Sequence, residues 1–142
     1  MPENRREKNH LEKNHSAEHV RAFLSAMEAR DLATAERYLA TGVVMQFPGA
    51  PPMQRLSEAV EWARTRYRSV SKTIFALDSY TSPPNAVVTC HGELKVEWLD
   101  GSTSTGVRFI DRFELTDGVI TRQDVWNDLA LVQQPPVTLT PQ

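Results

Sequence analysis

The sequence predicts a single α+β domain in which N-terminal helices pack in a strongly curved antiparallel sheet. Three observations lead to this fold class. Apolar residues recur with helical spacing up to about residue 70, alternate with polar residues from there to about residue 129, and are interrupted by turns rich in Pro, Gly, Asp and Asn. Helices followed by consecutive antiparallel strands are typical of α+β proteins. The length of 142 residues suits one domain with a substantial core.

The N-terminal region divides at residue 17. Residues 1–16 are polar and repeat the tetrapeptide EKNH, so we expect a solvated arm or a helical extension. The apolar positions of the first core helix then follow the spacing i, i+3, i+4, i+7, at Val20, Phe23, Leu24 and Met27. Ser16 has the chemistry of its N-cap. The domain therefore spans residues 17–132, and residues 133–142, which include three prolines, form an extended tail.

Residues 15–19 match the inverted zinc-protease motif H-x-x-E-H. That motif needs both histidines on one helix inside a cleft. A helix capped by Ser16 leaves His15 outside it, so we predict no metal site here.

Two further helices and one strand are expected before residue 70. Asp31 interrupts the first helix, and a short second helix covers 33–39. An apolar run at 43–47 predicts a strand, and prolines make 48–52 a loop. Gln54 or Ser57 caps a third helix, whose apolar stripe consists of Leu56, Val60, Ala63, Tyr67 and Val70.

Four strands follow, at 73–81, 86–98, 105–115 and 119–129, with turns at 82–85, at Asp100-Gly101 and at 116–118. In the second of these, polar residues alternate with an apolar set that predicts one buried face: Val88, Cys90, Gly92, Leu94 and Val96. The buried position of Cys90 predicts a neutral thiol that packs in the core, whereas His91 is expected on the outer face.

The last hairpin decides which residues face inward, because a slip of one residue moves every side chain to the other face. A two-residue turn at Asp117-Gly118 would place Asp111 opposite Asp124, and two carboxylates would repel each other. A three-residue loop with a bulge at Gly118 instead pairs Asp111 with Gln123. It also pairs residue 109 with 125 and residue 107 with 127. We predict this second register, with Arg108, Arg112 and Asp124 on the outer face.

The inward face of this hairpin carries three polar residues among apolar ones: Asp111, Gln123 and Asn127. A buried carboxylate is expensive without hydrogen-bond donors, and Gln123 can supply one. Two interpretations of Asp111 remain open. It is either a satisfied buried acid that fixes the register, or a pocket carboxylate that serves as an acid, a base or a hydrogen-bond donor.

Composition excludes several classes of function. The 16 basic and 18 acidic residues give a net charge of −2, which offers no electrostatic basis for binding nucleic acid. A single cysteine forbids an intrachain disulfide and a cysteine-cluster metal site. No apolar run approaches the roughly 18 residues that span a membrane, and the N-terminus lacks the apolar core of a secretory signal. We expect a cytoplasmic protein without a cofactor.

Outward-facing Ile110 and Trp126 leave an aliphatic and an aromatic side chain exposed on the sheet. Such a surface favours a partner, most simply a second copy of the chain. The sequence therefore predicts a homodimer through the outer sheet face.

Residues 18–131 resemble the nuclear transport factor 2-like superfamily, which includes the SnoaL-like polyketide cyclases and the ketosteroid isomerases. The similarity lies in Glu28–Leu32, Val43–Pro52, Phe109–Phe113 and Asp117–Ile120. It implies an apolar pocket between helices and concave sheet, and dimers formed through the sheet. In the ketosteroid isomerase pattern a tyrosine matches Phe23, the general-base aspartate matches Phe47, and the oxyanion-hole aspartate matches Asp111. Only the last of the three is present.

The other activities of this superfamily also lack their residues here. Carboxylates of the limonene epoxide hydrolases match Leu94 and Val125, their arginine matches Gly92, and the SnoaL cyclase acid falls at Val125. What remains is an apolar pocket for a small molecule, lined by Phe23, Met27, Phe47, Leu94, Phe109 and Val125, with Asp111, Gln123 and Asn127 as a polar floor. Two functions stay open. One is a cyclase, isomerase or dehydratase that acts on a hydrophobic carbonyl compound through Asp111. The other is a non-catalytic dimeric module that binds a hydrophobic ligand.

Overall fold

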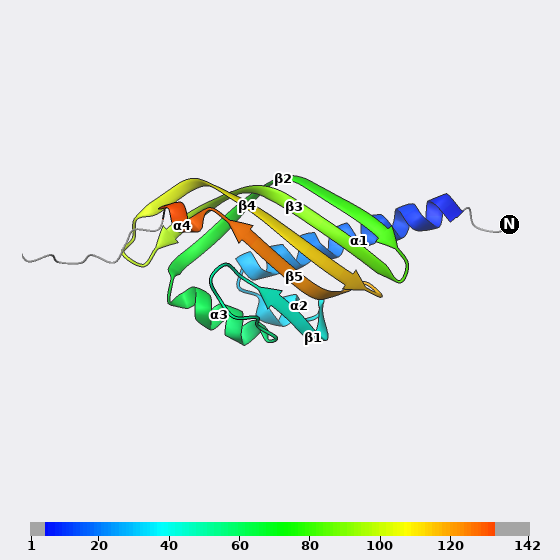
Figure 1. The fold of residues 1–142 in the computed structure, drawn as a ribbon, viewed down its shortest axis with the longest axis horizontal. Coiled ribbons are helices and arrows are strands. Elements are labelled where there is room, and N and C mark those ends of the chain that lie inside the picture. The colour runs from blue at the N-terminus through cyan, green and yellow to red at the C-terminus, as the bar shows by residue number, and fades with distance from the viewer. Residues whose placement is uncertain (1–4, 133–142) are drawn as a thin grey trace, which may run out of the picture.

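The structure, a computed structural model, describes residues 5–132, with side chains from His15 onward. The helices are α1 (Arg5–Glu28), α2 (Leu32–Glu36), α3 (Leu56–Arg64) and α4 (Leu129–Val132). The strands are β1 (Leu39–Gln46), β2 (Tyr67–Ser82), β3 (Asn85–Trp98), β4 (Thr103–Thr116) and β5 (Val119–Asn127). They form one curved sheet in the order β1-β5-β4-β3-β2, and α1, α2 and α3 lie on its concave side (Figure 1). The predicted α+β class is confirmed.

The helices differ from prediction at their ends. Because α1 begins at Arg5, Ser16 lies inside the helix and is not its N-cap. The third helix ends at Arg64 rather than near Val70. Tyr67 and Val70 instead belong to β2, where a bulge between Tyr67 and Ser69 adds a residue to the strand. The added residue interrupts the two-residue alternation of the strand. Tyr67 and Val70 are therefore three positions apart, which is also the spacing of residues on one face of a helix.

The sheet differs from a purely antiparallel one at one edge, because β1 pairs parallel to β5. The last strand also ends at Asn127, two residues earlier than predicted, and the chain continues into α4. The predicted tail at 133–142 lies outside the described residues.

The predicted loop of the last hairpin is wrong. Thr116 pairs with Val119, so the turn has two residues, and Asp117 and Gly118 both have positive φ, at 51° and 81°. Positive φ at both positions is the type I′ geometry that suits the twist of a hairpin. A bulge at Thr121 then shifts the remaining pairs by one residue. This bulge, rather than a longer loop, keeps the two aspartates apart.

The predicted pairs are therefore two residues out of register. Asp111 lies opposite Val125, while Gln123 and Asn127 lie opposite residues 113 and 109. A shift of two residues preserves which face each side chain occupies. The inward face of the hairpin is as predicted, and Asp124 lies on the outer face opposite Arg112.

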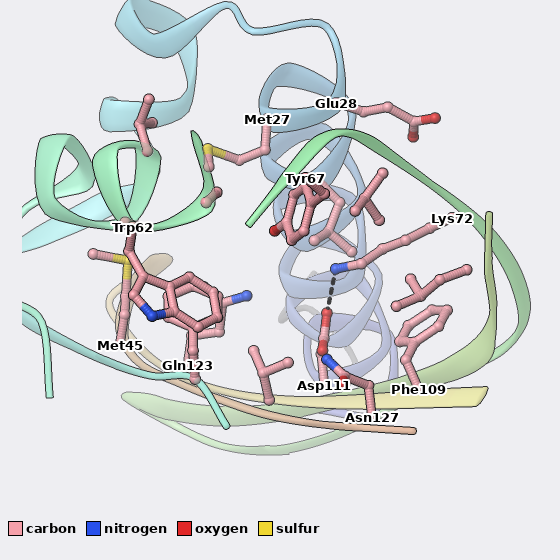
Figure 2. Close-up of a pocket in the computed structure, with 18 of the residues that line it drawn as sticks. Met27, Glu28, Met45, Trp62, Tyr67, Lys72, Phe109, Asp111, Gln123 and Asn127 are labelled. Carbon is pink, nitrogen blue, oxygen red and sulfur yellow. Dashed lines mark hydrogen bonds and ion pairs between the residues drawn. The ribbon is translucent and has the colours of Figure 1, made fainter. Parts of the chain in front are cut away.

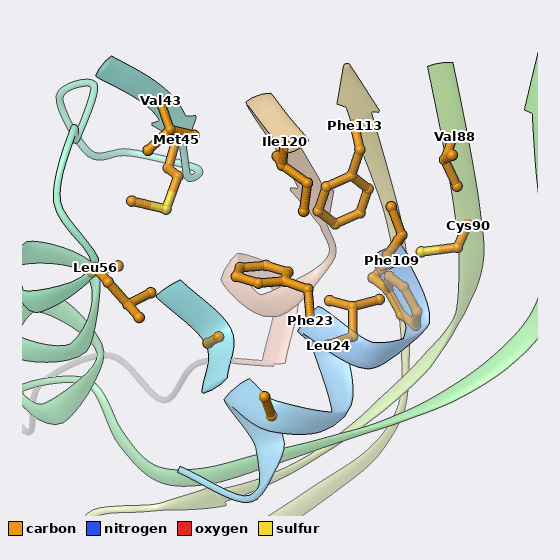
Figure 3. Close-up of a cluster of buried hydrophobic side chains, with 14 of the residues drawn as sticks. Phe23, Leu24, Val43, Met45, Leu56, Val88, Cys90, Phe109, Phe113 and Ile120 are labelled. Carbon is orange, nitrogen blue, oxygen red and sulfur yellow. The ribbon is translucent and has the colours of Figure 1, made fainter. Parts of the chain in front are cut away.

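The core fills the space between the concave face and the helices (Figure 3). Phe23 of α1 is 1% exposed and meets Phe113 of β4 edge to face, with ring centroids 6.1 Å apart. The predicted inward residues of β3 are also buried. This packing fixes α1 across the sheet and leaves the far end of the concavity for other residues.

A histidine ties α1 to the last hairpin. His19 Nδ1 lies 2.6 Å from the carbonyl oxygen of Gly118. Because a carbonyl only accepts, Nδ1 carries the hydrogen. The rings of His15 and His19 lie 4.0 Å apart on the same helix, but no group of three or more metal-ligating side chains forms among the described residues. No helix within residues 5–132 is long and apolar enough to cross a membrane.

Candidate functional site

A cavity of about 160 Å³ opens between α1, α3 and the concave face of the sheet (Figure 2). Its volume is similar to that of a roughly 150 Å³ apolar cavity that binds benzene. All nine residues that the sequence predicted for a pocket line it: Phe23, Met27, Phe47, Leu94, Phe109, Asp111, Gln123, Val125 and Asn127. That they bind a ligand stays a prediction.

Aromatic and aliphatic side chains form most of the wall. Phe47, just after β1, stacks on Trp62 of α3, with ring centroids 5.3 Å apart. Leu94 and Phe109 reach the cavity from β3 and β4 and are 4% exposed. Exposed Glu28 and Arg30 lie at the mouth, beside the end of α1. The cavity is therefore apolar inside and charged at its entrance.

The floor holds an ion pair that the sequence analysis did not predict. Lys72 Nζ of β2 donates a hydrogen bond to Asp111 Oδ2 of β4 at 2.6 Å. The Asp111 side chain is fully buried, whereas that of Lys72 is 23% exposed. The ammonium group also lies 5.1 Å from the centre of the Phe109 ring. A positive and a negative group thus share one end of an apolar cavity.

The electrostatics keep Lys72 protonated. Burial lowers the pKa of the Lys72 amine, but the charge and hydrogen bond of Asp111 raise it by more, so the net pKa is above its usual value. The second carboxylate oxygen of Asp111, Oδ1, is buried and has no hydrogen-bond partner among the described residues. Asn127 lines the same cavity. Asp111 therefore has one buried acceptor oxygen without a partner among the described residues, next to a fixed cation.

This pairing changes the role available to Asp111. The Asp111 carboxylate accepts a hydrogen bond from the Lys72 ammonium group, so it does not act as a donor. The group that can donate to a developing oxyanion is therefore Lys72. The signal for Lys72 was present in the sequence. Val70, Lys72 and Ile74 alternate along the strand, and both apolar neighbours pack against the core. A lysine at an inward-facing position of a strand indicates a partner of opposite charge, because buried charged residues are almost always paired.

Tyr67 was also missed, because it had been assigned to a helix. Its hydroxyl is directed into the cavity (Figure 2). Burial raises the pKa of the phenol, while the positive charges of Lys72, Arg30 and Arg66 act to lower it. The net pKa remains raised, so at neutral pH Tyr67 is a neutral hydrogen-bond donor.

Cys90 contributes no chemistry at this site. Burial, together with the Asp111 charge, raises the pKa of its thiol to about 12. A thiol with that pKa forms almost no thiolate, which is the reactive form. The structure thus agrees with the prediction of a neutral core thiol.

The outer face of the sheet carries a second feature. Ile110 and Trp126 lie directly opposite each other on β4 and β5 and are 43% and 53% exposed. Phe75 of β2 is 60% exposed, and all three border a shallow groove that also includes His91. The outward positions predicted for Ile110, Trp126 and His91 are confirmed.

A helix-lined apolar cavity inside a curved sheet is the architecture of a small-molecule-binding α+β domain. The chain belongs to the SnoaL-like domain family, whose model matches residues 20–123. The comparison with curated proteins gave no match.

Solved structures share the fold at low sequence identity. TerC, crystallised with polyporic acid, is 16% identical, with a TM-score of 0.69 over 83% of this chain and 95% of TerC. An NTF2-like protein of unknown function from Burkholderia pseudomallei is 19% identical, with a TM-score of 0.68 over 83% of this chain and 94% of that protein. A provisionally assigned ketosteroid isomerase from Shewanella frigidimarina is 17% identical, with a TM-score of 0.65 over 79% of this chain and 94% of that protein.

Proposed function

We propose that this protein catalyses a proton transfer on a small hydrophobic carbonyl compound, as an isomerase or cyclase does. The Lys72–Asp111 ion pair at the floor of the cavity carries the proposal. A base beside a cation is the combination needed to remove a proton from the carbon next to a carbonyl group. The fold supports this chemistry class, because provisionally assigned cyclases and isomerases are among its structural neighbours.

The proposed step uses both members of the pair. Asp111 Oδ1 takes a proton from the carbon next to the carbonyl group, and the electron pair of that C–H bond moves to form an enolate. The enolate oxygen accepts a hydrogen bond from Lys72, whose ammonium stabilises the new negative charge. In a substrate with a β,γ double bond this enolate is a conjugated dienolate. Asp111 then returns the proton to the γ-carbon, and the double bond moves to the α,β position, which isomerises the substrate. In a cyclase the enolate carbon instead attacks a second carbonyl carbon, and the proton goes to the alkoxide that forms.

Three features of the cavity support a hydrophobic ring compound as substrate. The wall is mainly apolar, the volume of about 160 Å³ suits a compact compound of one or two fused rings, and the Phe47–Trp62 stack offers a flat surface. TerC, which has the same fold, was crystallised with polyporic acid. Gln123 and Asn127 are proposed to orient the carbonyl oxygen through their amide groups.

Hydrogen–deuterium exchange tests the proposal. 2-Tetralone is a two-ring ketone with exchangeable hydrogens next to its carbonyl, and proton NMR in D₂O measures their loss. The protein should accelerate this exchange, and Asp111→Asn should reduce the acceleration by about 100-fold or more. The control Asp124→Asn removes the same charge from the outer face. Circular dichroism checks that both variants are folded.

Two results would contradict the proposal. Equal acceleration by the Asp111→Asn variant would remove Asp111 from the chemistry. Binding of the ketone without exchange would leave the cavity as a site for ligand binding alone, which is the second function that the sequence left open.

We also propose that the protein is a homodimer through its outer sheet face. Ile110, Trp126 and Phe75 form an exposed apolar surface there, and such surfaces on soluble domains are typical of interfaces. Trp126→Arg should lower the mass seen by sedimentation velocity from that of two chains to one. An unchanged mass would refute this interface.

A further inference from the structure

The cavity mouth holds an arginine in a conformation that favours glycine. Arg30 follows α1 and has φ of 61°. Its amide N–H bonds to the Met27 carbonyl at 3.1 Å, and the Asp31 N–H bonds to the Ala26 carbonyl at 2.8 Å. These two bonds define a Schellman motif, whose left-handed position is usually glycine. A left-handed arginine at a cavity entrance points to a use for its side chain.

The Arg30 guanidinium is positioned by more than the helix end. It donates to the Arg68 carbonyl oxygen at 3.2 Å, which ties the end of α1 to the beginning of β2. Arg30 also lines the cavity. The backbone conformation and the tether therefore hold a positive charge at the entrance.

Other cations stand around the same space. The Arg66 guanidinium lies over the Trp62 ring, 4.6 Å from its centre, and Lys72 reaches the cavity from its floor. Both, with Arg30, place positive potential at the Tyr67 hydroxyl, which is directed into the cavity (Figure 2). Of these cations Arg30 lines the cavity without an acidic partner in the described part of the chain, so a ligand atom near the Tyr67 hydroxyl meets the positive charge of Arg30 and a neutral donor.

Two acidic residues, Asp111 and Glu28, line the cavity together with Arg30 and Lys72. Asp111 is paired with Lys72 on the floor. Glu28 lines the mouth, but its carboxylate is directed away from Tyr67 (Figure 2). The local balance near Tyr67 therefore favours an anion.

We infer that the ligand of this cavity is a ring compound that carries an acidic group, a carboxylate or an ionised enol or phenol, bound at the mouth by Arg30 and Tyr67. The inference rests on the proposed function, in which the cavity is the substrate site. It specifies the substrate further. The reacting carbonyl lies at the Lys72–Asp111 end, and the acidic group lies at the other end, between α1 and β2.

A matched pair of probes tests the charge requirement. 2-Naphthoate and 2-naphthamide share one shape and differ in charge, so isothermal titration calorimetry measures the contribution of the carboxylate. The protein should bind naphthoate at least about 10-fold more tightly than naphthamide, as expected for one charge-assisted hydrogen bond. Arg30→Gln should abolish that preference by weakening naphthoate binding and leaving naphthamide binding unchanged. Glu28→Gln should increase the preference.

The control is Arg37→Gln, which removes an exposed arginine at the end of α2 that does not line the cavity. It should retain the full preference for naphthoate. Equal affinity for the two probes, a preference that survives Arg30→Gln, or the absence of binding by either probe would overturn the inference. If 2-tetralone exchange persists while the preference is absent, only this inference fails. If the preference is present but exchange is absent, the proton-transfer proposal fails instead.

Discussion

Replacing Lys72 with methionine should destabilise the protein strongly, because it leaves Asp111 charged and unpaired in the core. Asp111 is fully buried, and the Lys72 ammonium is its hydrogen-bond partner at 2.6 Å. Removing one member of a buried ion pair typically costs about 3–5 kcal/mol. Since Lys72 is 23% exposed, we expect a loss near the lower end, about 3 kcal/mol. In a domain of this size that corresponds to a decrease in Tm of roughly 9–12 °C.

The double variant Lys72→Met with Asp111→Leu separates two explanations of that loss. If the cost comes from the unpaired carboxylate, removing it should restore most of the stability, because hydrophobic replacements of buried pairs are often neutral or stabilising. Urea denaturation monitored by circular dichroism gives the free energies of unfolding. Lys95→Met, at an exposed position of β3, is the control and should change stability by less than about 0.5 kcal/mol. A Lys72→Met variant as stable as this control, or a double variant no better than the single one, would refute the reasoning.

Three other substitutions and treatments have defined outcomes. Arg30→Gly should raise the free energy of unfolding by about 1 kcal/mol, measured by urea denaturation, because glycine adopts the left-handed conformation without strain. Gly92→Ala should lower it by about 1–3 kcal/mol, because a Cβ at Gly92 would lie 1.9 Å from the Thr73 carbonyl oxygen. Cys90 should resist iodoacetamide at pH 8 until the protein unfolds, as judged by mass spectrometry, since its pKa is about 12 rather than 9. Between pH 9 and pH 12 the Cys90 thiol loses its proton in the unfolded protein but keeps it in the folded protein. The contribution of Cys90 to the free energy of unfolding should therefore decline as pH rises through this range.

Periodicity predicted the fold because each buried face depends on local spacing. The alternation in β3 placed Cys90 and Leu94 in the core correctly, and the helical spacing at residues 20–27 placed Phe23 there. The faces of the last hairpin were also correct, although its pairs were not. A bulge and a tight turn compensated each other there, and single-sequence spacing does not distinguish that combination from a longer loop.

The candidate site was harder to predict because it depends on contacts between distant residues. The Lys72–Asp111 pair joins residues 39 positions apart on strands β2 and β4, which are separated by β3 in the sheet. Both side chains line the cavity on the concave face, and the curvature of that face depends on bulges such as the one in β2. Asp111 was identifiable as an inward acid, but the bulge near Tyr67 hid the start of the strand that carries its partner.

Stability alone explains neither of the unusual features of the cavity. A buried ion pair is often replaceable by apolar residues without loss, and a glycine would suit the backbone of Arg30 better than arginine does. Both features place a fixed charge on the wall of the same apolar cavity. If Arg30→Gly and the double variant at Lys72 and Asp111 both fold at least as stably as the natural sequence, the fold does not require these charges. Loss of naphthoate preference in the first variant and of proton exchange in the second would then assign them to the ligand and to its reaction.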